Sequence, residues 1–226
     1  MEAFTRLYPD TASGLTADDV AALVPGEPPD DRPFLLVNMI ATADGRATIA
    51  GRAGPIANRA DYELFHALRT RVDAVMVGAE TVRVESYGPM EPAAVLVTRS
   101  VNVSPEVGLL RAPDNRVIVL TPSPDGELRP TAARVEYLRD DIVGGVRRLR
   151  TELGIRSVLS EGGPQILGDL VRAGLVDELH LVIGPKLAGG MDPLTIVSGA
   201  ALDPPVDLRL LTVHESGGYL FLRYGA

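Results

Sequence analysis

The sequence predicts an α/β fold with a mostly parallel central sheet, flanked by helices and completed by a C-terminal antiparallel hairpin. Between residues 34 and 183, short apolar segments alternate with segments whose apolar residues recur at helical spacing. The last two apolar segments, 208–214 and 219–224, are separated only by Glu215–Gly218, which is typical of a hairpin. We therefore expect helices on both faces of one sheet.

The strands and helices are expected in alternation along the chain. Asn58 is a suitable cap for a helix to about Thr70, and Asp140 and Asp141 stand at the favourable N-terminal end of a helix over 142–153. A third helix begins at Pro164, and a short one to about Val24 follows the capping sequence of residues 16–19. Buried strands are expected over 34–40, 74–77, 94–98, 117–121, 135–138, 157–160 and 178–183.

Composition limits the classes of protein to which the chain can belong. With 226 residues, 46% hydrophobic and 23% charged, it is long enough for one sizeable globular domain. We expect this domain over residues 34–226, preceded by an extension over residues 1–33 that contains the short helix and a Pro-rich linker. A net charge of −8 argues against a protein that coats nucleic acid or an anionic membrane.

Residue usage also narrows the chemistry. Cysteine is absent, which excludes disulfides, cysteine-ligated metals and a cysteine nucleophile. No two of the three histidines lie at metal-ligand spacing, so no metal site is expected. The N-terminus lacks the apolar core of a secretory signal, and no apolar run is long enough to span a bilayer. These features predict a cytoplasmic protein.

The segment Glu161-Gly162-Gly163-Pro164 combines a carboxylate, two glycines and a helix start at the end of an expected strand. Glycines allow a ligand to approach the backbone, and a helix start offers unpaired N–H donors and the positive end of the helix dipole. The segment is therefore either an ordinary tight turn or a site for a phosphate or pyrophosphate group.

Other strand ends carry further candidate residues. Asp44 precedes a glycine after the first strand, which favours a plain turn or a polar group at the rim of a crevice. Arg69 or Arg71 could bind an anion or pair with the C-terminal end of its helix. Gly78 and Thr81 could contact a phosphate or ribose, with Glu85 one turn later. Because ligands in such sheets bind beyond the carboxyl ends of strands, these residues should lie close together.

Three ordered blocks carry a resemblance to a known family. They are T-A-D-G-R at 42–46, L-R-x-x-x-D-A-V-M-V-G-A-E-T-V at 68–82, and L-S-E-G-G-P-x-I-L-G-D-L-V-R-A-G-L-V-D-E-L-H-L-V-I-G-P-K-L-A-G-G at 159–190. Together they resemble the reductase domain of riboflavin biosynthesis, in its stand-alone form, over roughly residues 34–224. That resemblance implies a dihydrofolate-reductase-like fold.

The resemblance implies NADPH-dependent reduction of 5-amino-6-(5-phosphoribosylamino)uracil, with hydride reaching C1′ of the ring-opened ribose. Asp44 and Glu161 would be catalytic residues facing the substrate, and Arg69 would bind it. Arg83 is the substitute for a phosphate-binding arginine that the family often has and that residues 84–92 lack. The cofactor-binding residues implied are Ala41, Thr81, Glu85, Arg99, Ser100, Gly162, Gly163, Pro164, Gln165 and Ile166.

Two other functions remain open from the sequence. One is an NADPH-dependent reductase of another pterin- or pyrimidine-like substrate, such as dihydrofolate. The other is a non-catalytic nucleotide-binding protein that kept the fold. A homodimer is also expected, because the apolar succession Leu220–Leu222 suggests a sheet edge covered by a partner, although an internally buried strand would give the same pattern.

Overall fold

A computed structural model describes residues 1–191 and 193–226, and its strands form one eleven-stranded sheet. Seven neighbouring strands are parallel, in the order β9-β3-β8-β4-β5-β6-β7, and four antiparallel strands extend the sheet beyond β9 as β11, β10, β1 and β2. The parallel strands are β3 (Phe34–Thr42), β4 (Ala74–Gly78), β5 (Ala93–Val97), β6 (Arg116–Thr121), β7 (Arg134–Arg139), β8 (Ser157–Ser160) and β9 (Glu178–Gly184). The antiparallel strands are β1 (Phe4–Tyr8), β2 (Ala12–Leu15), β10 (Arg209–Ser216) and β11 (Tyr219–Gly225).

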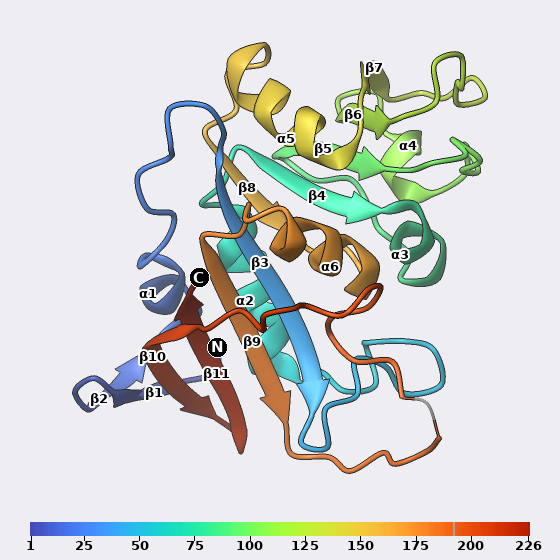
Figure 1. Cartoon of the computed structure of the whole chain (residues 1–226). Coiled ribbons are helices and arrows are strands. Elements are labelled where there is room, and N and C mark those ends of the chain that lie inside the picture. Colours follow the sequence, from blue (N-terminus) through green and yellow to red (C-terminus); the bar gives the residue numbers. More distant parts are fainter. Residues whose placement is uncertain (192) are drawn as a thin grey trace.

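Helices cover both faces of the sheet, as the sequence predicts (Figure 1). Four pack on one face, namely α1 (Ala17–Ala21), α2 (Arg59–Arg69), α3 (Ala79–Val84) and α4 (Gly108–Arg111). On the opposite face lie α5 (Ile142–Thr151) and α6 (Pro164–Arg172). The predicted fold class is therefore confirmed. Among the described residues, no helix is both long enough and apolar enough to cross a membrane.

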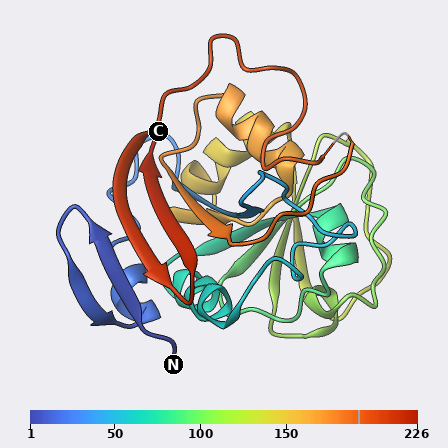
Figure 2. The ribbon, with the colours of Figure 1, turned by 90° about the horizontal axis from the view of Figure 1, so that it is seen from below.

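Residues 1–33 belong to the same sheet as the rest of the chain. The strands β1 and β2 were not expected from the sequence, and β1 pairs with β10 in antiparallel register (Figure 2). Phe4 is fully buried and its ring packs edge-on against Phe221, with 5.0 Å between the centroids. The short helix α1 in turn packs on α2. The N-terminal extension therefore adds two strands to the sheet and packs its short helix on α2.

The C-terminal hairpin has its expected position, but its last strand does not form a sheet edge. Strand β11 lies between β9 and β10, and β1 covers the other side of β10. Of the two explanations for the apolar residues Leu220–Leu222, the internal strand is therefore the one that the structure shows. The homodimer stays a prediction, without support from this edge.

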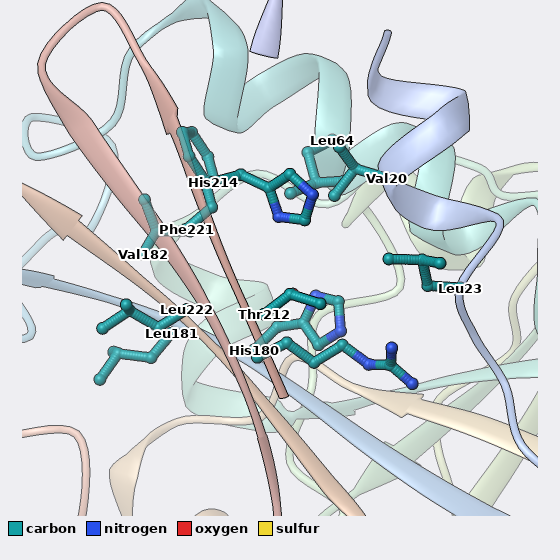
Figure 3. A pocket seen from close by; sticks show the side chains of 11 residues that line it. Val20, Leu23, Leu64, His180, Leu181, Val182, Thr212, His214, Phe221 and Leu222 are labelled. Carbon is teal, nitrogen blue, oxygen red and sulfur yellow. The ribbon is translucent and has the colours of Figure 1, made fainter. Parts of the chain in front are cut away.

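A small cavity of about 10 Å³ lies between α1, α2 and the strands β9 to β11 (Figure 3). His180 and His214 line it, with only 5% and 1% of their surfaces exposed. The Nε2 atoms of both rings have no hydrogen-bond partner among the described residues. Burial lowers the pKa of His180 to about 3 and that of His214 to about 4, so both rings are neutral at ordinary pH.

These buried histidines predict a loss of stability in mild acid. Because the folded-state pKa of His180 lies below its unfolded value, the unfolded chain binds protons first as the pH falls below about 6.5. We expect the free energy of unfolding to decrease between about pH 7 and pH 5, and His180→Gln to reduce that decrease by about 1–2 kcal/mol. Urea unfolding of wild type and His180→Gln at pH 7 and pH 5 measures both free energies.

His66→Gln is the control for this experiment, because His66 is exposed on α2 and should alter the pH dependence much less. If the free energy of unfolding of His180→Gln depends on pH as strongly as that of wild type, the buried His180 ring does not have the lowered pKa.

Candidate functional site

A cleft of about 1350 Å³ opens at the carboxyl ends of the parallel strands. Its lining includes the end of β4 and the first turn of α3, the residues that follow β5, and the loop between β8 and α6. The prediction that scattered strand ends come together in space is therefore confirmed for the ends of β4, β5 and β8 and for part of β3, but not for Ala41 and Asp44. The segments concerned are Asn38–Ile40, Gly78–Thr81, Val97–Ser100 and Glu161–Ile166.

The start of α6 provides a group of backbone donors in this cleft. Gly163 is the N-cap and has no side-chain cap, and Pro164 occupies the first helical position. The N–H groups of Gln165 and Ile166, in the first turn, therefore have no partner within the helix. All these residues line the cleft, so the donors and the positive end of the helix dipole are available to an anion.

Close packing explains the glycines beside this helix start. A Cβ at Gly162 would lie 2.9 Å from three side-chain atoms of Ile166, which is too close for any other residue without a shift. A Cβ at Gly163 would lie 3.4 Å from Thr81 Oγ1, so the α3 side chain stands directly beside the α6 start. The two glycines thus allow α3 and α6 to approach each other at the point where an anion would bind.

Two further predicted cofactor residues follow β5. Arg99 and Ser100 are exposed and line the cleft. The Arg99 side chain makes no hydrogen bond or ion pair within the residues that the structure describes, whereas Ser100 Oγ accepts a long hydrogen bond of 3.4 Å from the Asn102 N–H. The geometry leaves Arg99 free to pair with an anionic group at this side of the cleft.

Glu161, Arg69 and Tyr87 form a buried cluster in the cleft wall. Arg69 Nε donates to Glu161 Oε1 at 2.8 Å, and Arg69 Nη2 donates to Oε2 at 2.7 Å. The Tyr87 hydroxyl donates to Oε2 at 2.9 Å. Only 3% of the Glu161 side chain and 14% of the Arg69 side chain are exposed, and the guanidinium lies 4.0 Å from the centre of the Phe65 ring. The three side chains hold one another in fixed positions.

The charge states of this cluster follow from its burial. Burial raises the pKa of the Glu161 carboxyl, and the Arg69 guanidinium and the Tyr87 hydroxyl oppose that increase. Burial, followed by the neighbouring Glu161, raises the pKa of Tyr87 well above its usual value, so Tyr87 stays protonated and acts as a donor. The bidentate geometry is that of a carboxylate paired with a guanidinium.

This arrangement changes what Glu161 and Arg69 can do. Both carboxylate oxygens of Glu161 are already occupied, so in this geometry it holds Arg69 and Tyr87 in place. Arg69 Nη1 makes no hydrogen bond to the described residues, which leaves one edge of the guanidinium for a substrate oxygen. The catalytic role of Glu161 and the substrate contact of Arg69 stay predictions.

Asp44 and Ala41 do not line the cleft, as far as the described residues define it. The Asp44 carboxylate accepts from Thr42 Oγ1 at 2.5 Å and from the Gly189 N–H at 2.7 Å. Those hydrogen bonds lower its pKa to about 2, which makes it an ionised anchor for the loop after β9. Ala41 is buried in β3. The catalytic role of Asp44 and the cofactor contact at Ala41 stay predictions, to which this geometry adds no support.

Arg83 and Glu85 line the cleft, but their polar atoms are used within the protein. Arg83 pairs with Glu80 at 2.6 Å and donates to the Asn102 carbonyl at 3.0 Å. Glu85 accepts from the Ala53 N–H at 2.8 Å and so holds the loop before α2 against the end of α3. Phosphate binding by Arg83 and cofactor binding by Glu85 stay predictions that would require these contacts to change.

The lining residues that were not identified as site residues from the sequence include Asn38, Asp61 and Tyr87. Asn38 stands within an apolar strand, and its Oδ1 atom is buried without a partner among the described residues. Tyr87 lies in the segment that departs from the family pattern. Asn38 could have been identified from the sequence, because it is a polar residue inside a predicted buried strand. The position of Tyr87 depended on where its loop folds.

Comparisons with known proteins identify the family of this chain. The family model described as RibD C-terminal domain matches residues 33–221. The 2,5-diamino-6-ribosylamino-4(3H)-pyrimidinone 5′-phosphate reductase of Methanothermobacter thermautotrophicus is 29% identical over 203 residues, covering 82% of this chain and 93% of that protein. The Aquifex aeolicus reductase of the same name is 28% identical, covering 75% of this chain and 84% of its own length.

Solved structures show the same fold. The deaminase/5-amino-6-(5-phosphoribosylamino)uracil reductase of Thermotoga maritima has a TM-score of 0.73 and 25% identity, and the match covers 86% of this chain and 56% of that one. A pyrimidine reductase-like protein of Corynebacterium diphtheriae has a TM-score of 0.75 at 22% identity, covering 93% and 98% of the two chains, and indicates the fold alone.

The buried ion pair predicts a large stability effect at Glu161. Glu161→Gln leaves the Arg69 guanidinium buried opposite a neutral amide, which should lower the free energy of unfolding by about 3 kcal/mol. Tyr87→Phe, which removes only the hydroxyl donor, should lower it by about 1 kcal/mol. Urea unfolding at neutral pH measures both changes.

The matched control is Glu152→Gln, because Glu152 pairs with Arg148 on the surface, where half of its side chain is exposed. That change should cost less than about 1 kcal/mol. Equal effects at Glu161 and Glu152 would show that the buried pair contributes no more than a surface pair.

Proposed function

Because this chain belongs to the RibD C-terminal domain family, we propose that it is an NADPH-dependent reductase of a phosphorylated ribosylaminopyrimidine in riboflavin biosynthesis. The observation that carries the proposal is the cleft, in which the uncapped start of α6 lies beside the Glu161–Arg69–Tyr87 cluster. The sequence resemblance names 5-amino-6-(5-phosphoribosylamino)uracil as substrate, whereas the stand-alone relatives are named for the 2,5-diaminopyrimidinone.

Reductases of this kind use a nicotinamide cofactor, and we propose NADPH, which when bound supplies a hydride. The residues present suit its charged groups. The Gln165 and Ile166 N–H groups at the α6 start would hold the pyrophosphate, with Thr81 beside them. Arg99 would pair with the 2′-phosphate, since its guanidinium is exposed and unpaired within the described part of the chain.

The protein's part in the reaction is to hold the substrate in contact with the cofactor and to place charge near the reacting carbon. Arg69, oriented by Glu161 and Tyr87, would bind a substrate oxygen through Nη1. Glu161 would thus be a positioning residue, because it acts through Arg69. We also retain a cytoplasmic location and a homodimer as proposals; light scattering of the purified protein tests the second.

The test is oxidation of NADPH, followed optically, with four additions in parallel: the uracil substrate, the diaminopyrimidinone substrate, dihydrofolate, and none. We expect turnover with at least one of the two ribosylaminopyrimidine phosphates and none without substrate. Turnover with dihydrofolate alone would overturn the substrate assignment. Binding of NADPH without any turnover would indicate a non-catalytic nucleotide-binding protein. Failure to bind NADPH would exclude reduction of a ribosylaminopyrimidine and of dihydrofolate alike.

Coenzyme preference gives a second prediction. Arg99→Ala should raise the KM for NADPH by about 10- to 100-fold and leave the KM for NADH nearly unchanged, because only NADPH carries the phosphate that Arg99 would pair with. Arg111→Ala, on α4, is the control, since Arg111 is exposed and lies outside the cleft lining. If the KM values for NADPH and NADH rise equally in Arg99→Ala, Arg99 does not bind the 2′-phosphate.

A further inference from the structure

The first turn of α2 presents a carboxyl group to the cleft for which the protein provides no partner. Asp61 lines the cleft, and within the described residues its carboxyl group accepts no hydrogen bond and pairs with no cation. Burial alone raises its pKa to about 6. Desolvation of a carboxylate without compensation costs free energy, and such groups are concentrated at sites where a ligand supplies the missing partners.

A second helix of this chain shows that Asp61 could have had a local partner. Asp19 and Asp61 are both the third residue of a helix, and their backbone N–H groups bond to the N-cap side chains of Thr16 and Asn58. In α1, the Asp19 carboxylate turns back and accepts from the Thr16 N–H at 2.8 Å, which completes the capping box. In α2 the Asp61 side chain does not make the corresponding bond.

Asp61 belongs to one face of α2 that forms a wall of the cleft. Asp61, Phe65 and Arg69 are spaced four residues apart, and all three line the cleft, so they follow one another at about 6 Å per step along the helix. The cation of this row, Arg69, is already paired with Glu161. His66, which neighbours Phe65, is exposed, and burial followed by Arg69 lowers its pKa, so it supplies no charge for Asp61 at neutral pH.

This row matches the chemistry of a planar heterocyclic base. A carboxylate accepts two parallel N–H donors in the same plane. Phe65, with the Arg69 guanidinium over its ring, adds apolar surface to the same wall of the cleft. A 2-aminopyrimidin-4(3H)-one presents its 2-amino group and N3–H side by side as such a pair. A uracil ring has a carbonyl oxygen in place of the amino group, and that oxygen would face a carboxylate oxygen without a proton between them.

We propose that Asp61 is a specificity-determining residue that binds the 2-amino and N3–H edge of a 2-aminopyrimidinone, so that this protein acts on the diaminopyrimidinone in preference to the uracil. This inference rests on the proposed reductase function and specifies its substrate class. No covalent step involves Asp61: the carboxylate accepts two hydrogen bonds, and the reaction occurs at the ribosyl carbon.

The same geometry distinguishes recognition from a structural role. If Asp61 stabilised the α2 start, its replacement would weaken the fold. The raised pKa has the opposite consequence: the ionised carboxylate is disfavoured in the folded state, so its cost is present above about pH 6 and disappears as the pH falls below the unfolded pKa. Asp61→Asn should therefore leave the thermal midpoint unchanged or raise it at neutral pH.

The experiment compares wild type, Asp61→Asn and Asp19→Asn in NADPH-dependent turnover of both pyrimidine substrates, with thermal unfolding of each protein. For Asp61→Asn, we expect the KM for the diaminopyrimidinone to rise by about 10- to 100-fold, since a charged bidentate acceptor is lost. The KM for the uracil should not rise, because the Asn amide can donate to the uracil carbonyl as a protonated carboxyl would, and the KM for NADPH should change by less than about threefold. Asp19→Asn, remote from the cleft, should lower the thermal midpoint and leave the kinetic constants unchanged.

The pH profile provides a readout that a structural role would not produce. In wild type, the preference for the diaminopyrimidinone should decrease as the pH falls below about 6, because a protonated Asp61 can donate to the uracil carbonyl. In Asp61→Asn this pH dependence of the preference should be absent. Equal losses for both substrates, no loss for either, or a wild-type preference for the uracil would each overturn the inference.

Failure of the proposed function gives a different result. If wild type oxidises NADPH with neither pyrimidine, the reductase assignment is wrong, and calorimetric titration of the same two compounds then decides the inference. Tighter binding of the diaminopyrimidinone that Asp61→Asn abolishes would support recognition by Asp61 in a protein of another activity. Equal binding of the two compounds, or none, would overturn it.

Discussion

The bidentate ion pair between Arg69 and Glu161 joins parts of the chain that are 92 residues apart, and the walls of the cleft depend on it. Arg69 ends α2 on one face of the sheet, whereas Glu161 precedes α6 on the other. Tyr87 connects the segment after α3 to the same carboxylate. Because a buried charge is stable only with its partner, these three elements are constrained to one relative position.

Three carboxyl groups illustrate how environment assigns different roles to one kind of side chain. Glu161 is buried and fully bonded, so it orients its neighbours. Asp44 accepts backbone and hydroxyl donors, which hold its pKa at about 2 and make it an anchor for a loop. Asp61 is partly buried and has no partner among the described residues, and burial raises its pKa to about 6. Only the last has acceptor capacity left for a ligand, although only the first two stand in motifs that the sequence singled out.

The parallel part of the sheet and its helices were predictable because they follow from local pattern. Buried strands such as 74–77 are continuous apolar runs, and α2 and α6 have recognisable starts at Asn58 and Pro164. Strands β1 and β2 were missed because they are short and lie at one end of the sheet, where Phe4 is their one buried residue and no apolar run is required. The packing of Phe4 on Phe221, far apart in sequence, secures them.

The sequence by itself determined the alternation of strands and helices, the glycine-rich start of α6 and the grouping of strand ends at one edge, since all three depend on residues that are neighbours along the chain. Only the tertiary structure decided that Glu161 is tied to Arg69 and Tyr87, that Asp44 lies outside the cleft, and that Asp61 faces into it without a partner. Hydrogen-bond partners and desolvation arise from elements brought together across the fold, and no local pattern records them.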